Sequence, residues 1–89
     1  MREVITTSSF KKDYKRLKRS GHYVMDELKS VVELITKDET LPEKYCDHPL
    51  TGNLRDCREC HIKPDWLLIY QLQLNELVLV RTGSHSELF

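Results

Sequence analysis

Residues 66–72 read WLLIYQL, and they contain the longest unbroken apolar run of the chain, from Trp66 to Tyr70. A stretch that is apolar at almost every position suits a central strand that is buried on both faces. The run is far too short to span a bilayer. A second apolar strand is expected at residues 76–82, where Gly83 ends it. We therefore expect the sheet to be organised around residues 66–72.

The residues that precede this strand predict a helical hairpin. Phe10, Tyr14 and Leu17 lie at positions i, i+4 and i+7 and give the first helix one apolar stripe, with Ser8 or Ser9 available as its N-cap. The second helix shows the same helical period of apolar residues. The expected elements are a strand at residues 2–6, helices at 10–19 and 23–36, and strands at 54–62, 66–72 and 76–82.

The order β-α-α-β-β-β predicts a single α+β domain over residues 1–89, in which a mostly antiparallel sheet packs against the helical hairpin. Prolines and a glycine interrupt residues 38–53, so His48 is expected on a loop. Residues 63–65 read as a turn, and residues 84–89 read as a short tail.

The charge of the chain is balanced overall but uneven locally. Its 14 Lys and Arg residues equal its 14 Asp and Glu residues, so the whole protein is not expected to be steered toward nucleic acid. Residues 11–19, KKDYKRLKR, nevertheless hold six basic residues against one acid, Asp13. This face is either a phosphate-binding surface or an ordinary solvated one. The basic residues are Lys11, Lys12, Lys15, Arg16, Lys18 and Arg19.

The cysteines and the N-terminal residues indicate the compartment. The first ten residues, MREVITTSSF, contain no hydrophobic segment or cleavage site of the kind that export signals have. Three cysteines without such a signal favour reduced thiols over a disulfide framework. We therefore expect a cytoplasmic protein without membrane contact.

The last third of the chain gathers groups that can move protons near neutral pH. Three of the four histidines, His48, His61 and His85, lie there or just before it, together with Asp65 and Arg81. Metal-free RNA cleavage needs a base for the ribose 2′-OH, an acid for the leaving 5′-oxygen and a cation for the phosphate charge. The histidines and Asp65 are candidates for the acid and base, and Arg81 is the candidate cation.

The predicted fold allows these residues to meet at one end of the sheet. His61 and Asp65 flank the turn between two paired strands, Arg81 ends the last strand, and His85 follows four residues later. Trp66 and Phe89 are candidates for stacking on unpaired bases. Each residue taken alone is equally compatible with a solvated surface position or a core position, so the hypothesis depends on the set.

A competing motif overlaps this set. Residues 57–61, CRECH, spell the Cys-x-x-Cys-His motif of covalent haem attachment, but that motif requires export and here lies in a predicted strand. Zinc is the other alternative, since Cys46, His48, Cys57, Cys60 and His61 are enough for a tetrahedral site. In an extended strand Cys57 and Cys60 point to opposite faces, which disfavours a shared metal. We expect no metal and no cofactor.

Several segments match a known family. They are FKKD at residues 10–13, DHPL at 47–50 followed by Gly52, HIKPDWLLIY at 61–70 and RTGSHSELF at 81–89. With these segments the sequence resembles the YafQ-like branch of the RelE/ParE superfamily of bacterial type II toxins. The resemblance covers nearly the whole chain.

The resemblance implies a compact RNase fold and a ribosome-dependent endoribonuclease that cleaves mRNA in the ribosomal A site without a metal. Attack by the 2′-OH would leave a 2′,3′-cyclic phosphate, and a cognate antitoxin would silence the toxin. The residues 11–19 would contact 16S ribosomal RNA. The family's active-site positions fall on His48, His61, Asp65, Arg81 and His85, its terminal aromatic falls on Phe89, and Trp66 matches a neighbour of the active site.

Two alternatives remain at this point. A non-enzymatic toxin of the same fold, similar to ParE, would bind a protein target such as a topoisomerase and would not need clustered histidines. A small zinc- or haem-binding protein is the second alternative, based on the cysteines. The codon preference, the identity of the antitoxin and the role of the cysteines do not follow from the sequence.

Overall fold

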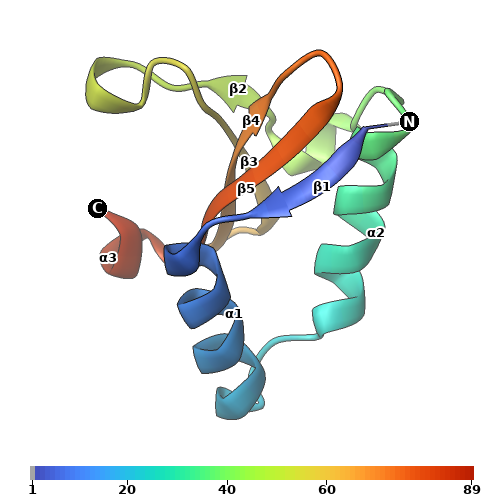
Figure 1. Cartoon of the computed structure of the whole chain (residues 1–89). Helices are drawn as coiled ribbons and strands as arrows, with labels where there is room; N and C mark the ends of the chain where they lie inside the picture. Colours follow the sequence, from blue (N-terminus) through green and yellow to red (C-terminus); the bar gives the residue numbers. More distant parts are fainter. Residues whose placement is uncertain (1) are drawn as a thin grey trace.

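The computed structural model describes residues 2–89 as a five-stranded sheet with two long helices and a short C-terminal helix (Figure 1). The strands are β1 (Glu3–Thr6), β2 (His48–Pro49), β3 (Arg58–Lys63), β4 (Trp66–Leu72) and β5 (Glu76–Gly83). The helices are α1 (Ser8–Ser20), α2 (Met25–Thr36) and α3 (His85–Leu88), with 3-10 turns η1 (Glu43–Tyr45) and η2 (Gly52–Leu54). The predicted α+β class and the order of the main elements are confirmed.

The sheet has the strand order β1-β5-β4-β3-β2. The neighbours β5, β4, β3 and β2 pair in antiparallel fashion, whereas β1 pairs parallel to β5. The expectation of a mostly antiparallel sheet is therefore correct. β4 lies in the middle of the sheet and has a strand on each side, as its apolar sequence predicts.

The two faces of β4 have different surroundings. Trp66, Leu68 and Tyr70 belong to the hydrophobic core that the helices α1 and α2 complete. Leu67 and Ile69 are buried as well, at 0% and 1% exposure, but they alternate onto the opposite face and stand apart from that core. The second face of the sheet therefore has an apolar floor, on which the polar side chains of the last third of the chain are arranged.

Local signals place the two long helices. Thr7 is the N-cap of α1, because its Oγ1 accepts a hydrogen bond of 3.0 Å from the amide of Phe10, and the expected caps Ser8 and Ser9 are already helical. Gly21 ends α1 in the left-handed conformation with φ 74°. α2 begins at Met25 and not at the expected residue 23. Tyr23 instead packs edge-on against Trp66, with ring centroids 5.0 Å apart.

Three sequence expectations need correction. The strand expected at 54–62 begins only at Arg58, because residues 52–54 form a 3-10 turn. His48 is in the two-residue strand β2, opposite Glu59, and not on a loop. The expected tail contains α3, which Ser84 and Glu87 start with a reciprocal capping box. None of the helices in residues 2–89 is long and apolar enough to cross a membrane.

Candidate active site

Strand register brings the candidate residues onto one face of the sheet. Residues that lie opposite each other in antiparallel pairs share a face. One such row runs from His48 through Glu59 and Ile69 to Arg81, and the next runs from His61 through Leu67 to Gly83. The buried Ile69 and Leu67 therefore form the floor between the β2–β3 side and the β5 side of this face. The register therefore places residues 48, 61 and 81 on the same face of the sheet.

His85 is oriented by Asp65. The His85 Nδ1 atom lies 2.8 Å from the Asp65 Oδ1 atom, and the His85 amide donates to the same oxygen at 3.1 Å. The hydrogen bonds from the ring and the amide of His85 lower the pKa of Asp65 below its ordinary value, so Asp65 is a carboxylate and accepts both hydrogen bonds. The Nδ1 atom of His85 then carries a proton, and its Nε2 atom is the nitrogen left to exchange one.

His48 is held differently, because both of its ring nitrogens face acceptors. The Nδ1 atom lies 2.6 Å from the Cys46 carbonyl oxygen, which can only accept, so Nδ1 carries a proton. The Nε2 atom lies 2.9 Å from Glu59 Oε2, and this contact needs one further proton between imidazole and carboxyl. The Glu59 side chain is only 8% exposed. His48 and Glu59 therefore form a half-buried pair in which both ring nitrogens of His48 have partners.

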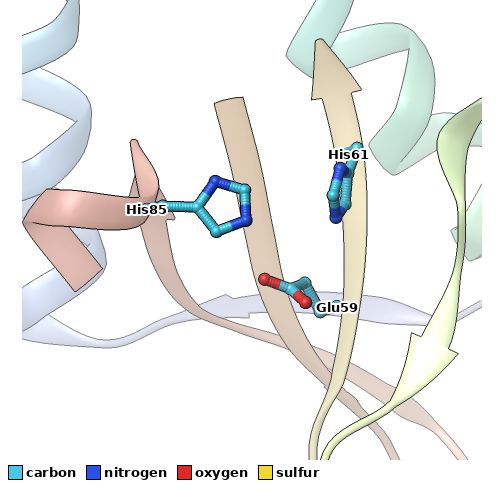
Figure 2. A group of neighbouring side chains, drawn as sticks. All are labelled: Glu59, His61 and His85. Carbon is cyan, nitrogen blue, oxygen red and sulfur yellow. The ribbon is translucent and has the colours of Figure 1, made fainter. Parts of the chain in front are cut away.

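Glu59 also faces the other two histidines. Figure 2 shows its carboxyl group between the rings of His61 and His85. One ligand atom from each of these three residues lies within 4.8 Å of the others, and the ring centroids of His61 and His85 are 5.6 Å apart. The Oε1 atom of Glu59 is buried and has no hydrogen-bond partner among the described residues. The Glu59 carboxyl group thus has one oxygen bound to His48 and one buried oxygen without a donor among these residues.

Glu59 was not among the site residues expected from the sequence. It lies two residues before His61, and in a strand positions i and i+2 project to the same face. This alternation predicts that Glu59 and His61 share a face, although the sequence was interpreted at this point only through the CRECH motif of residues 57–61. Three carboxyl- or imidazole-bearing residues from β3 and α3 therefore meet where the sequence indicated only the histidines.

Arg81 faces an acid and is not an isolated cation. Its Nε and Nη2 atoms donate to the two carboxylate oxygens of Asp13 at 2.6 and 3.2 Å. The Asp13 side chain is 3% exposed, and the Arg81 side chain is 36% exposed. A guanidinium group has five N–H donors, so this bidentate contact leaves donors on the exposed part of Arg81. The arginine is thus oriented and can still hold an anion.

The proposed RNA-binding residues have different surroundings. Lys11, Lys12, Lys15, Lys18 and Arg19 are exposed on α1. Arg16 has protein partners, with Nη1 2.9 Å from Asp13 Oδ1 and Nε 3.0 Å from Glu87 Oε2. Phe89 is 64% exposed. The basic residues and Phe89 therefore remain candidates for contact with RNA.

Trp66 requires a correction. Its side chain is 2% exposed, and its indole Nε1 donates to the Thr82 hydroxyl at 3.0 Å. The ring packs in the helix-side core, where Tyr23 covers it, because residues 66, 68 and 70 alternate onto that face. Trp66 therefore presents no ring face on which an RNA base can stack, and it acts as a core residue at the edge of the site.

The cysteines do not converge on a metal. Cys60 is 0% exposed in the helix-side core, whereas His61 projects to the opposite face. Burial raises the pKa of the Cys60 thiol to about 12, so this residue stays a neutral thiol at neutral pH. Cys46 is exposed, Cys57 is partly buried, and all three thiols are free. The geometry thus contradicts a shared site of Cys57, Cys60 and His61 for haem or zinc.

A family model matches the sequence of almost the whole chain. The model described as the bacterial toxin of type II toxin-antitoxin system, YafQ, matches residues 2–89. The chain belongs to the YafQ family. Membership confirms the resemblance that the segments at residues 47–50, 61–70 and 81–89 indicated.

The chain is similar to a named toxin and to toxins of known structure. The mRNA interferase toxin YafQ of Escherichia coli K12 is 38% identical over 89 residues, which are 99% of this chain and 96% of that protein. A metal-bound toxin from Helicobacter pylori is 48% identical over the full length of both chains, with a TM-score of 0.93. The E. coli DinJ–YafQ complex contains a chain that is 39% identical, covers 100% of this chain and 99% of that one, and has a TM-score of 0.88.

Proposed function

We propose that this YafQ-family toxin is a ribosome-dependent endoribonuclease that cleaves mRNA in the ribosomal A site by metal-free acid–base catalysis. The observation that carries the proposal is the oriented His85, whose Nδ1 is bound to Asp65 and whose Nε2 remains to exchange a proton. The mRNA interferase name of the E. coli relative supports the same reaction class. A ParE-like toxin that only binds a protein target would not need this arrangement.

In the proposed reaction the ribose 2′-OH attacks the adjacent phosphorus. The new bond from the 2′-oxygen to phosphorus forms as the bond to the 5′-oxygen breaks, which leaves a 2′,3′-cyclic phosphate and a 5′-hydroxyl. One of the site's titratable groups takes the 2′ proton and another supplies a proton to the 5′-oxygen. His48, His61, His85 and Asp65 share these roles with orientation, and the remaining donors of Arg81 stabilise the phosphate charge.

The proposed partners follow from the same geometry and from the relatives. The exposed basic residues of α1 would hold 16S ribosomal RNA phosphates, and Phe89 would stack on an mRNA base. A cognate antitoxin would bind and silence the toxin, as the DinJ–YafQ complex illustrates for the E. coli protein. The protein would act in the cytoplasm, where ribosomes translate.

The test is cell-free translation followed by primer extension on the mRNA. The active chain should give cuts at fixed codon positions, and His85→Ala should give none. His22→Ala is the matched control, because His22 is an exposed histidine in the turn between α1 and α2. Cuts that persist in His85→Ala would contradict the catalytic proposal. Equal cutting of mRNA without ribosomes would contradict ribosome dependence.

Metal binding is a second candidate, favoured by the Glu59, His61 and His85 cluster and by the metal-bound H. pylori relative. Two imidazoles and a carboxylate are a donor set that suits zinc or copper. Such an ion would occupy the His61 and His85 nitrogens that acid–base catalysis needs. Metal-free catalysis therefore predicts that toxin stripped of metal with EDTA, and then dialysed into the Mg²⁺-containing translation buffer, cleaves at an unchanged rate and that added Zn²⁺ or Cu²⁺ inhibits it. Loss of cleavage after this stripping, restored by adding one of these ions to the toxin, would instead support a metal role in catalysis.

A further inference from the structure

Asp13 is a buried carboxylate on the basic helix α1, and four hydrogen bonds end on it. Arg81 Nε and the Thr82 amide donate to its Oδ2 atom at 2.6 and 3.2 Å. Arg81 Nη2 and Arg16 Nη1 donate to its Oδ1 atom at 3.2 and 2.9 Å. Burial alone would raise the pKa of Asp13, but these bonds hold it below its ordinary value. The group is thus an ionised carboxylate with both oxygens occupied.

The strand topology explains why a carboxylate lies at this point. The register between β1 and β5 ends where Thr6 meets Leu79, after which the chain turns into α1. β5 continues to Gly83, so its amide edge at Thr82 has no β1 residue opposite it. Asp13 accepts a hydrogen bond from the Thr82 amide, where a neighbouring strand would otherwise supply a carbonyl oxygen. Its position is therefore fixed relative to the backbone of β5, next to Arg81.

The contact with Arg81 determines how that side chain is oriented. The pairing of β4 and β5 shifts between Ile69 and Tyr70, so that Arg81 follows an irregularity in the strand. A long arginine side chain has many rotamers, and a bidentate contact to a fixed carboxylate selects among them. Asp13 occupies the Nε edge and one Nη2 donor, which leaves the opposite edge of the guanidinium plane for a second anion.

A second branch of the network leads to His85. Arg16 bridges Asp13 to Glu87, with Nε 3.0 Å from Glu87 Oε2. Glu87 is the residue whose side chain completes the capping box of α3, and α3 begins with His85. Figure 1 shows α3 beside α1 at the end of β5, as this contact requires. The Asp13 carboxylate thus contacts Arg81 directly. Through Arg16 and Glu87 it is also linked to α3, the helix that begins with His85.

We propose that Asp13 is a positioning residue for RNA cleavage, which orients Arg81 so that its remaining N–H donors face the scissile phosphate. This inference rests on the proposed nuclease function, because it assigns Asp13 a role through Arg81. It also assigns Arg16 to the support of α3 and not to contact with ribosomal RNA. A carboxylate that only stabilised the fold would not depend on Arg81 for its effect on the reaction.

A double-mutant cycle tests this dependence. The single-turnover rate of ribosome-bound mRNA cleavage is measured for the unchanged chain, Asp13→Asn, Arg81→Ala and the double variant. Displacement of a positioned group by about 1 Å can cost on the order of 100-fold in rate. Asp13→Asn should therefore lower the rate by about 10- to 100-fold when Arg81 is present and should add nothing in the Arg81→Ala background. The exposed Asp56→Asn is the matched control and should keep the full rate.

The outcomes separate this inference from the nuclease proposal. Equal losses from Asp13→Asn in both backgrounds would show a purely structural role and overturn the inference. A full rate in Arg81→Ala would also overturn it, while the His85→Ala experiment would still decide the nuclease function. If Asp13→Asn fails to fold, Asp13→Glu replaces it, because it keeps the charge but shifts the carboxylate by one methylene. Asp13→Glu should melt cooperatively and still cleave slowly, and a full rate in this variant would overturn the inference.

Discussion

Two histidine–carboxylate pairs lie on either side of His61, and they differ in which nitrogen faces the acid. His85 turns Nδ1 to the exposed Asp65 and keeps Nε2 for exchange, whereas His48 has acceptors at both nitrogens. The Asp65 side chain is 71% exposed, and that of Glu59 is 8% exposed. Thus one pair leaves a ring nitrogen without a protein acceptor among the hydrogen bonds described above, whereas the other occupies both ring nitrogens of its histidine. A list of histidines in a sequence does not distinguish these two situations.

The largest expected effect separates the two histidines in the cleavage reaction. His85→Ala should lower the single-turnover rate by about 10²- to 10⁴-fold, which is the range for loss of a general acid or base. His48→Ala should lower it less, by roughly tenfold, because neither nitrogen of His48 is free to exchange a proton with RNA. Rates are measured on translating ribosomes with saturating toxin. A larger loss in His48→Ala than in His85→Ala would reverse the roles assigned to the two pairs.

Asp65→Asn should have the next largest effect. The amide keeps the shape of Asp65 but not its charge, so that it no longer fixes the Nδ1-protonated form of His85. We expect a rate loss of about tenfold, less than for His85→Ala, since the imidazole itself remains. The double variant His85→Ala/Asp65→Asn should be no slower than His85→Ala alone. An additional loss in the double variant would mean that Asp65 acts on RNA independently of His85.

The same substitutions should affect the stability of the fold in the opposite order to their effect on the cleavage rate. His48→Ala leaves the buried Glu59 carboxyl without its only hydrogen-bond partner among residues 2–89, which costs about 1–3 kcal/mol of unfolding free energy. The measurement is the urea midpoint at neutral pH. His85→Ala and Asp65→Asn should leave this midpoint nearly unchanged, because both side chains are exposed. If all three variants shift the midpoint equally, the burial difference between the pairs has no energetic consequence.

The smallest expected effect is a pH dependence of stability at the Asp65 pair. Hydrogen bonds from His85 lower the pKa of Asp65 in the folded chain below its ordinary value of 3.8. The contribution of Asp65 to stability is therefore fully present above pH 3.8 and is lost as the pH falls through the folded pKa. The difference in melting temperature between the unchanged chain and Asp65→Asn should shrink in that acidic range. If this difference in melting temperature instead grows as the pH falls, the hydrogen bonds from His85 do not stabilise the Asp65 carboxylate.

Much of the fold follows from periodicity within the sequence. The apolar residues 66–70 indicated the central strand, and the helical stripes indicated α1 and α2, because local burial patterns determine both. The sequence Ser84-His85-Ser86-Glu87 also carried a readable capping box, and the helix that it starts was missed. β2 could not be expected from local pattern, since a two-residue strand depends on its partner Glu59.

The sequence indicated some of the candidate site residues but not the contacts between residues that are far apart in the chain. His48, His61, Asp65 and His85 were found because their side chains are chemically distinctive. The contact of Asp13 with Arg81 joins residues 68 positions apart, and no local periodicity encodes it. The only signal in the sequence was a lone acid among the six basic residues of 11–19. Trp66 was misassigned because its aromatic character alone does not show on which face of β4 it lies.

The parallel pairing of β1 with β5 has a consequence for the synthesis of this protein. The hydroxyl group of Thr7, between β1 and α1, donates a hydrogen bond to the carbonyl oxygen of Val80, 73 positions later in the chain. Contacts of such long sequence separation form late, since the loop between them must close first. On a ribosome that is making the toxin, the first strand has no partner until the last strand has emerged. The same last strand carries Arg81 and leads into His85, so the candidate active site cannot assemble before this strand has emerged.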